Sequence, residues 1–149
     1  MYKRILVAID ASPTSQKAFA EALALAKGYA ATLCIVHAAD ESGLAQHGMG
    51  LGSYIDVDKV KQAIRDESNQ LLAEAQAKAK AAGVDAEIKL LEATDKRVAD
   101  QIVEGAAALQ ADLVVVGTHG RRGVDRLLVG SVAERLTRIA TTSLLLVRG

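Results

Sequence analysis

Hydrophobic residues gather in five short runs along the chain, separated by longer stretches in which apolar positions recur at helical spacing. Most of these runs are continuous rather than alternating, which is typical of strands buried on both faces of a parallel sheet. The predicted strands cover residues 5–9, 33–36, 86–91, 113–116 and 144–147.

Four amphipathic stretches between these runs predict helices. They cover residues 13–28, 58–82 and 95–109 and a stretch that begins at residue 131. Ser12 followed by Pro13 is a capping residue before a proline at the first helical position, which favours a helix start there. Ser131 with Glu134 three residues later has the spacing of a capping box and predicts the last helix start.

Strand and helix alternate to the end of the chain, which is the pattern of an α/β protein with an open parallel sheet. We therefore predict one domain over residues 1–149, with five parallel strands and helices on both faces. The chain has no internal repeat and no linker-like segment. Spacing alone leaves the strand order open and does not exclude a flavodoxin-like order.

Composition narrows the function classes. Eighteen basic and eighteen acidic residues cancel, so the chain has no general attraction for nucleic acid or anionic lipid. One Phe, three Tyr and no Trp are too few for the stacking platforms of single-strand nucleic-acid modules. A single cysteine cannot form an internal disulfide, and no apolar run approaches the roughly 18 residues of a membrane span. We expect a cytoplasmic protein without a signal peptide.

Two loops are longer than this plan requires, at residues 38–57 and 118–129. Both follow the carboxyl ends of predicted strands, where parallel sheets bind ligands. Gly117 and Gly120 lie at the start of the second loop, and after nine intervening residues Gly130 and Ser131 follow its end. Glycines allow close backbone approach and a helix N-terminus attracts phosphate, so the loop predicts a phosphate site. An ordinary glycine turn, with Ser131 as a plain helix cap, is the alternative interpretation.

Standard nucleotide motifs do not account for this loop. No Lys-Ser or Lys-Thr follows a glycine run of the P-loop type. The glycine-rich segment 48–53 resembles a dinucleotide fingerprint, but Ser53 occupies its third glycine position and no helix is predicted to begin there. Arg121, Arg122 and Arg126 either neutralise phosphate charge or form a solvated loop surface.

Several side chains near the strand ends are candidates for chemistry. Asp10 either accepts hydrogen bonds from a nucleotide or closes the turn before the first helix. His37, His47 and His119 lack metal-ligand spacing, so we expect no transition-metal site, whereas Mg²⁺ carried by nucleotide phosphates is compatible with the pattern. Cys34 lies in the middle of a predicted strand and is expected in the core.

The opening residues, from Tyr2 to Ser12, resemble the start of universal stress proteins. The pattern Gly117-x-x-Gly120-x9-Gly130-Ser131 is similar to the ATP-binding motif of that family's nucleotide-binding branch. The resemblance covers the whole chain. It implies a Rossmann-like fold of the adenine nucleotide alpha hydrolase type, with strand order 3-2-1-4-5 and ATP, with or without Mg²⁺, between the first and fourth strands.

The resemblance also implies the binding residues. On the adenosine side they are Ala8, Ile9, Asp10 and, through its main chain, Ala38. Around ribose and phosphates they are Val116, Gly117, His119 and Gly120, and at the phosphate tail Gly130, Ser131 and Val132.

Family members pair two such domains through their fifth strands, here Ser143–Val147, which implies a homodimer. Three positions depart from the family pattern. Ala133 replaces a hydroxyl residue that often contacts phosphate, and residues 141–143 replace a Pro-Cys-Pro segment before the last strand. Residues 93–95 replace a Gly-x-Pro, and there we expect Thr94 or Asp95 to cap the third helix.

The resemblance favours a nucleotide-responsive regulatory or stress-resistance module over an enzyme, because no nucleophile is accompanied by a base and an orienting partner. Two alternatives stay open. One is a weak ATPase or self-phosphorylating protein with Thr118 or Ser131 as acceptor, and the other is an interaction protein that binds no nucleotide.

Overall fold

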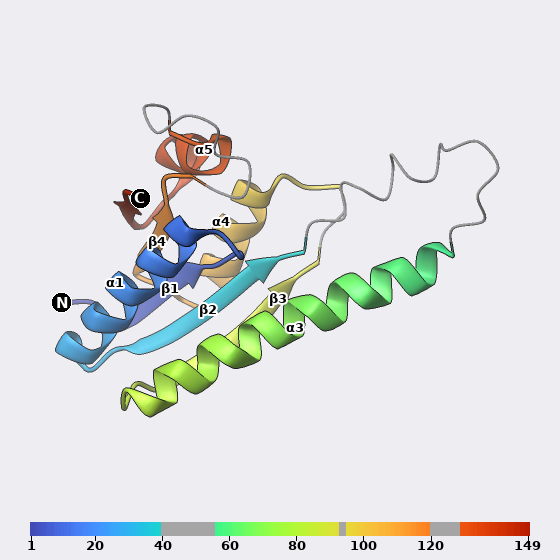
Figure 1. Ribbon diagram of the computed structural model, residues 1–149. Helices are drawn as coiled ribbons and strands as arrows, with labels where there is room; N and C mark the ends of the chain where they lie inside the picture. The colour runs from blue at the N-terminus through green and yellow to red at the C-terminus, as the bar shows by residue number, and fades with distance from the viewer. Residues whose placement is uncertain (40–55, 93–94, 120–128) are drawn as a thin grey trace.

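Five parallel strands form a single sheet in the order β3-β2-β1-β4-β5 (Figure 1). The structure is a computed structural model and describes residues 1–39, 56–92, 95–119 and 129–149. The predicted strands and their implied order are confirmed, with ends that agree to within two residues. The strands are β1 Arg4–Ala8, β2 Thr32–Ala38, β3 Ala86–Leu91, β4 Leu113–Gly117 and β5 Ser143–Val147.

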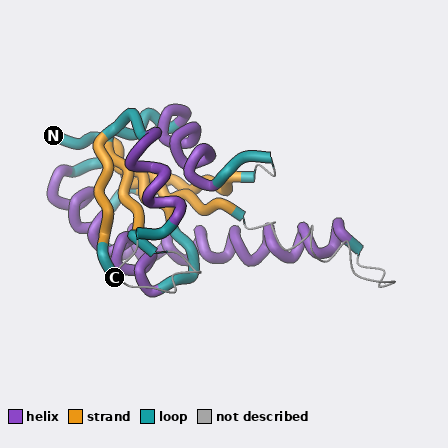
Figure 2. The backbone as a smooth tube through the Cα atoms, turned by 90° about the horizontal axis from the view of Figure 1, so that it is seen from above, coloured by secondary structure: helices purple, strands orange, loops and turns teal. Residues whose placement is uncertain are grey.

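Helices cover both faces of this sheet. Helices α1 (Pro13–Tyr29) and α3 (Val57–Ala81) pack on one face, and α4 (Val98–Ala108) and α5 (Ser131–Ile139) pack on the other. Viewed from above, helices lie on both sides of the strands, and the N-terminal half of α3 extends past the strand ends (Figures 1 and 2). Within the described residues, no helix is both long and apolar enough to span a membrane.

The core consists of two layers that share the sheet between them. Alternate residues of β1 point to opposite faces, so Ile5 and Val7 join the layer under α1 and α3, while Leu6 joins the layer under α4 and α5. These three side chains are fully buried. Burial on both faces explains why the strands read as continuous apolar runs.

Cys34 belongs to the second layer and is 1% exposed, as predicted for a core position. Burial raises the pKa of its thiol above the usual range, although the Arg4 guanidinium nearby opposes the shift. Arg4 itself donates to Glu87 over 2.8 Å and to the Leu109 carbonyl over 2.7 Å. Cys34 is therefore a thiol held in its neutral form within the sheet.

The helix starts and ends test the capping predictions. Ser12 caps α1 as predicted, because its Oγ accepts a hydrogen bond from the Ser15 amide over 3.1 Å. The predicted start of α5 at Ser131 is confirmed, but the capping box is wrong, because Gly130 is the N-cap and Ser131 is already the first helical residue. Glu134 is therefore the fourth residue of the helix, and its amide makes an ordinary helical bond to the Gly130 carbonyl over 2.9 Å.

Two further boundaries differ from the predictions. Helix α4 begins at Val98 after Arg97, so Asp95 lies too far upstream to cap it, and Thr94 falls outside the described residues. Helix α1 continues through Gly28 and ends only at Tyr29. Its C-cap is Ala30 in the left-handed conformation, and the next amide donates back to the Ala26 carbonyl over 2.9 Å.

Candidate functional site

A cavity of about 760 Å³ opens at the carboxyl ends of the central strands. Here β1 leads into α1 on one face of the sheet, while β4 leads towards α5 on the other face. Such a reversal in strand order leaves a crevice between the two diverging connections. The volume falls within the range of about 300–1,000 Å³ that is typical of small-molecule sites.

The sequence-predicted residues meet at this cavity from three separate strand ends and one helix start. Those that line it are Ala8, Ile9, Asp10, Ala38, Val116, Gly117, His119, Gly130, Ser131 and Val132. Gly120 and the loop arginines Arg121, Arg122 and Arg126 lie outside the described residues. The structure thus brings the two sequence motifs together, and their roles in binding stay predictions.

Asp10 sits in a turn held by two short hydrogen bonds. Its Oδ1 accepts from the Ser12 amide over 2.7 Å, and its own amide donates to the Ser15 Oγ over 2.8 Å. The turn role is therefore present in the structure. Among the described residues the turn engages one carboxylate oxygen, Oδ1, and because each carboxylate oxygen can accept more than one bond, Asp10 keeps acceptor capacity at the cavity wall.

His37 is held in one orientation beside Ala38. Its Nδ1 lies 2.7 Å from the Ile9 carbonyl, and the Ile9 amide donates to the Val36 carbonyl over 2.9 Å. A carbonyl oxygen can only accept, so Nδ1 carries the proton, and in the neutral ring Nε2 is an acceptor. No group of three metal-ligating side chains occurs in the part of the chain that the structure describes.

The end of β4 is pinned on both sides. The Thr118 amide donates to the Val147 carbonyl over 2.9 Å, and the Gly130 amide donates to the Thr118 carbonyl over 2.6 Å. These bonds tie the end of the strand both to the sheet and to the start of α5. A Cβ on Gly117 would lie 2.7 Å from the Thr14 Cγ2, so glycine is needed there for α1 to approach β4.

His119 carries a polar atom that the fold leaves unsatisfied. Its Nδ1 lies 2.9 Å from the Thr118 Oγ1, but its Nε2 is buried and has no hydrogen-bond partner among the described residues. A buried polar atom without a partner costs about 1–3 kcal/mol. Because His119 lines the cavity, a ligand that supplies a partner for Nε2 would remove this cost.

The first turn of α5 closes the cavity on the side of β4. Ser131 is exposed and forms no cap hydrogen bond, whereas Ala133 is 2% exposed and packs into the core. The amides of a helix's first turn have no partners within the helix and form a seat for an anion. Ala133 has no hydroxyl, so this turn lacks the phosphate contact that the family pattern often has at this position.

Helix α3 supplies a wall that sequence reasoning did not find. Ile64, Ser68 and Leu71 line the cavity, and Val98 and Ile102 of α4 complete its apolar surface. Ile64 and Leu71 fall on the apolar stripe whose periodicity predicts the helix over residues 58–82, and such a stripe ordinarily packs against the core. The usable signal was Ser68, a polar residue on that stripe that is only 4% exposed.

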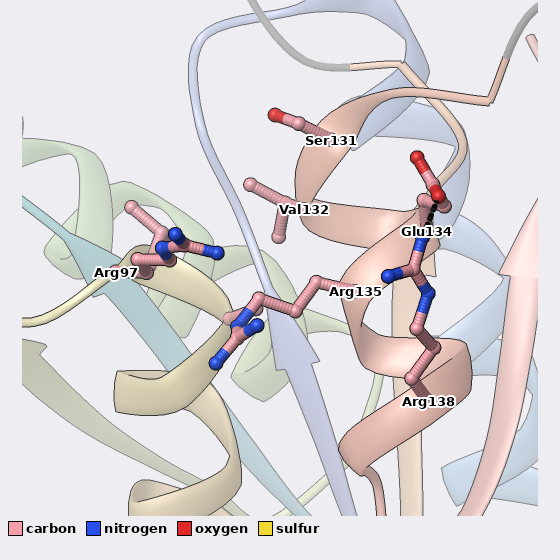
Figure 3. A pocket seen from close by; sticks show the side chains of 8 residues that line it. Arg97, Ser131, Val132, Glu134, Arg135 and Arg138 are labelled. Atoms are coloured by element: carbon pink, nitrogen blue, oxygen red, sulfur yellow. Dashed lines mark hydrogen bonds and ion pairs between the residues drawn. The ribbon is translucent and has the colours of Figure 1, made fainter.

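A second cavity of about 480 Å³ lies between the first turns of α4 and α5 (Figure 3). Arg97, Arg135 and Arg138 line it. Arg135 donates two hydrogen bonds to Asp100, over 3.0 and 3.1 Å, and the Arg135 guanidinium lowers the pKa of that carboxyl. Arg138 forms an ion pair with Glu134 within α5.

Comparison with known proteins agrees with this architecture over nearly the whole chain. A family model described as the universal stress protein family matches residues 1–148. Universal stress protein A homolog 1 of Coxiella burnetii is 37% identical over 146 residues, covering 98% of this chain and 96% of its own length.

Two solved structures extend the comparison. A universal stress protein family member from Burkholderia pseudomallei is 32% identical with a TM-score of 0.79, covering 99% of this chain and 97% of that one. A universal stress protein solved in complex with cAMP is 29% identical with a TM-score of 0.66, covering 98% and 97%. On the match of sequence and fold over its length, the chain belongs to the universal stress protein family.

Proposed function

We propose that the cavity between β1 and β4 binds ATP and that its occupancy sets the conformation or partner choice of a regulatory stress protein. The observation that carries this proposal is the convergence of Asp10, Gly117, His119 and Ser131 on one cavity of about 760 Å³. These residues come from distant parts of the sequence, and the family pattern assigns all of them to the same ligand.

The adenosine end of the proposed site lies between the ends of β1 and β2. Apolar residues of α3 and α4, among them Leu71 and Ile102, offer a surface on which a purine ring can pack. His37 presents an acceptor nitrogen beside Ala38 when its ring is neutral, which suits the amino group of adenine. Asp10 has carboxylate capacity for the ribose hydroxyls.

The phosphate end lies at the start of α5. The first-turn amides of Ser131 and Val132, the Ser131 hydroxyl and the N-terminal end of the helix dipole favour an anion there. Mg²⁺, when bound with ATP, would be held chiefly by the phosphates and water. A family member with cAMP bound supports the nucleotide class, because cAMP shares both adenosine and phosphate with ATP.

The hydroxyl groups that line the described part of the cavity favour ATP binding over self-phosphorylation. Thr118 is 4% exposed and its Oγ1 already lies against His119, which leaves it poorly placed as a phosphate acceptor. Ser131 is exposed and is the residue to examine if self-phosphorylation is tested.

The proposal predicts thermal stabilisation by nucleotide. At an ATP concentration about 100 times Kd, binding to the folded state adds about 2.7 kcal/mol to the free energy of unfolding. For a chain of this size we expect Tm to rise by about 5–10 °C with Mg-ATP. Inorganic triphosphate with Mg²⁺ is the control, and equal shifts with ATP and the control would mean that adenosine is not recognised.

We also propose a homodimer through β5. This strand pairs with β4 on one side and is the last strand of the sheet, and its residues Leu144 to Val147 are only half-buried. An apolar edge strand of this kind needs covering to avoid uncontrolled pairing.

Leu146→Lys tests the homodimer, because Leu146 lies on the edge strand, half-buried beside the core layer under α4 and α5, and a charge on an edge strand opposes strand pairing. We expect the wild-type mass in solution to be twice that of the chain and the variant mass to equal one chain, measured by analytical ultracentrifugation. Ile88→Lys on β3, the opposite edge of the sheet, is the matched control and should remain dimeric. A folded Leu146→Lys variant that is still dimeric would move the interface elsewhere.

A further inference from the structure

The second cavity adjoins the proposed nucleotide site. Val98, Ser131 and Val132 line both cavities, so the two share a wall at the point where α5 begins. In Figure 3, Arg97 extends from the start of α4 on one side of Val132, and Ser131 lies at the start of α5. A group held at Ser131 therefore lies at the border of a cavity lined by arginines.

The three arginines differ in how far their charge is already neutralised. Arg135 makes a two-point contact with Asp100, and Arg138 is paired with Glu134. Arg97 forms no ion pair with any residue in the described ranges. Its charge nevertheless contributes, after that of Arg135, to lowering the pKa of the Asp100 carboxyl. Three guanidinium groups and two carboxylates leave one positive charge in excess, and Arg97 is the group that carries it.

The position of Arg97 is set by the backbone at the start of α4, and its side chain takes no part in capping the helix. It is the N-cap of α4, in an extended conformation, and its side chain makes no cap hydrogen bond. It is exposed, so its guanidinium is accessible to a solute. A guanidinium group can bind two phosphate oxygens at once, which distinguishes it from a surface point charge.

We propose that Arg97 binds the terminal phosphates of the nucleotide and thereby selects a triphosphate over a monophosphate. This inference rests on the proposed function, since it requires the nucleotide in the adjoining cavity. The terminal phosphates lie at the first turn of α5, where Ser131 and Val132 border the second cavity. The phosphate of a monophosphate stays nearer Gly117 and does not reach that border.

Arg97→Gln tests this assignment through the ratio of two affinities. A charge-assisted hydrogen bond to phosphate is worth about one to two powers of ten in affinity. We expect calorimetric titration to show ATP binding weakened by about tenfold or more, with AMP binding changed by less than about twofold. Lys96→Gln is the matched control, because it removes a positive charge from the residue next to Arg97. The Lys96 side chain is paired with Glu104 and lines neither cavity.

The outcomes separate this inference from the function on which it rests. If wild-type protein binds both ATP and AMP and Arg97→Gln leaves their ratio unchanged, the role of Arg97 is wrong while the nucleotide site stands. If wild-type protein binds neither nucleotide, the proposed function fails and this inference fails with it. A purely structural role for Arg97 would weaken ATP and AMP binding together, which also overturns the assignment.

Discussion

Gly130→Val is expected to weaken ATP binding by about a hundredfold or more, equivalent to about 3 kcal/mol, while the fold is retained. Gly130 lines the cavity at the start of α5, and its amide donates to the Thr118 carbonyl over 2.6 Å. Because Gly130 lines the cavity beside Ser131, we expect a branched side chain there to narrow the space in which the phosphates are proposed to lie. Titration with Mg-ATP measures the loss.

The backbone at Gly130 makes this variant a clean test. Its φ of −61° and ψ of 159° are extended values that any residue adopts, so valine adds no backbone strain. Gly28→Val is the matched control, because a Cβ at Gly28 meets nothing within 4 Å. If Gly130→Val is folded and binds ATP as tightly as Gly28→Val does, the glycine loop is a structural turn.

Leu136→Ala is expected to give the largest loss of stability among single core changes in α5. Leu136 is fully buried and belongs to the layer between the sheet and helices α4 and α5. Truncating a buried leucine costs about 2–5 kcal/mol, because both the transfer free energy and the packing around the new cavity are lost. We expect Tm to fall by about 6–12 °C for a loss of about 3 kcal/mol.

Val57→Ala provides the comparison for this core variant. Val57 is 42% exposed at the start of α3, and its truncation should cost less than about 1 kcal/mol. Chemical denaturation at constant slope gives both free energies. Equal losses for the two variants would mean that α5 is not anchored to the sheet through Leu136. ATP affinity measured on Leu136→Ala would then show whether the phosphate end depends on that anchor.

The strands could be predicted from sequence because burial on both faces leaves few polar positions in them. Ile5, Leu6 and Val7 are all fully buried, and a short continuous run of branched apolar residues is typical of such a strand. The strand order could not be derived from the same pattern, because βαβ spacing is the same for several orders. It came from the resemblance of the first strand and the glycine loop to one family.

The capping residues were harder to predict than the helix starts, because several residues near a start can act as a cap. Helices α1 and α5 begin at Pro13 and Ser131 as predicted. Ser131 and Glu134 have the capping-box spacing, yet the N-cap of α5 is Gly130, whose amide donates to the Thr118 carbonyl. Long-range contacts decide this position, and a local pattern does not contain them. The same holds for α4, where the chain enters the helix at Arg97 and Asp95 stays outside.

The candidate site was predictable where a motif marks it and was missed where only packing does. Asp10 and His119 each lie two residues beyond the carboxyl end of a strand, β1 and β4, so their place at this edge of the sheet follows from topology. Ile64 and Leu71 of α3 read as ordinary core residues, because their role at the cavity depends on how far the helix extends past the strand ends. No sequence motif marks Arg97 as a cavity residue, because the residues that line the second cavity with it, such as Ser131 and Val132, belong to another helix.

The measurement that tests the central claim most directly is equilibrium titration of the nucleotide-free protein with Mg-ATP. To prepare this sample, the purified protein is unfolded, released nucleotide is removed by anion exchange, and the chain is refolded. We predict saturable binding with one ATP per chain and an affinity that Gly130→Val weakens by about a hundredfold or more. Absence of binding at millimolar ATP, ADP and AMP, with the wild-type melting curve intact, would contradict a nucleotide site between β1 and β4.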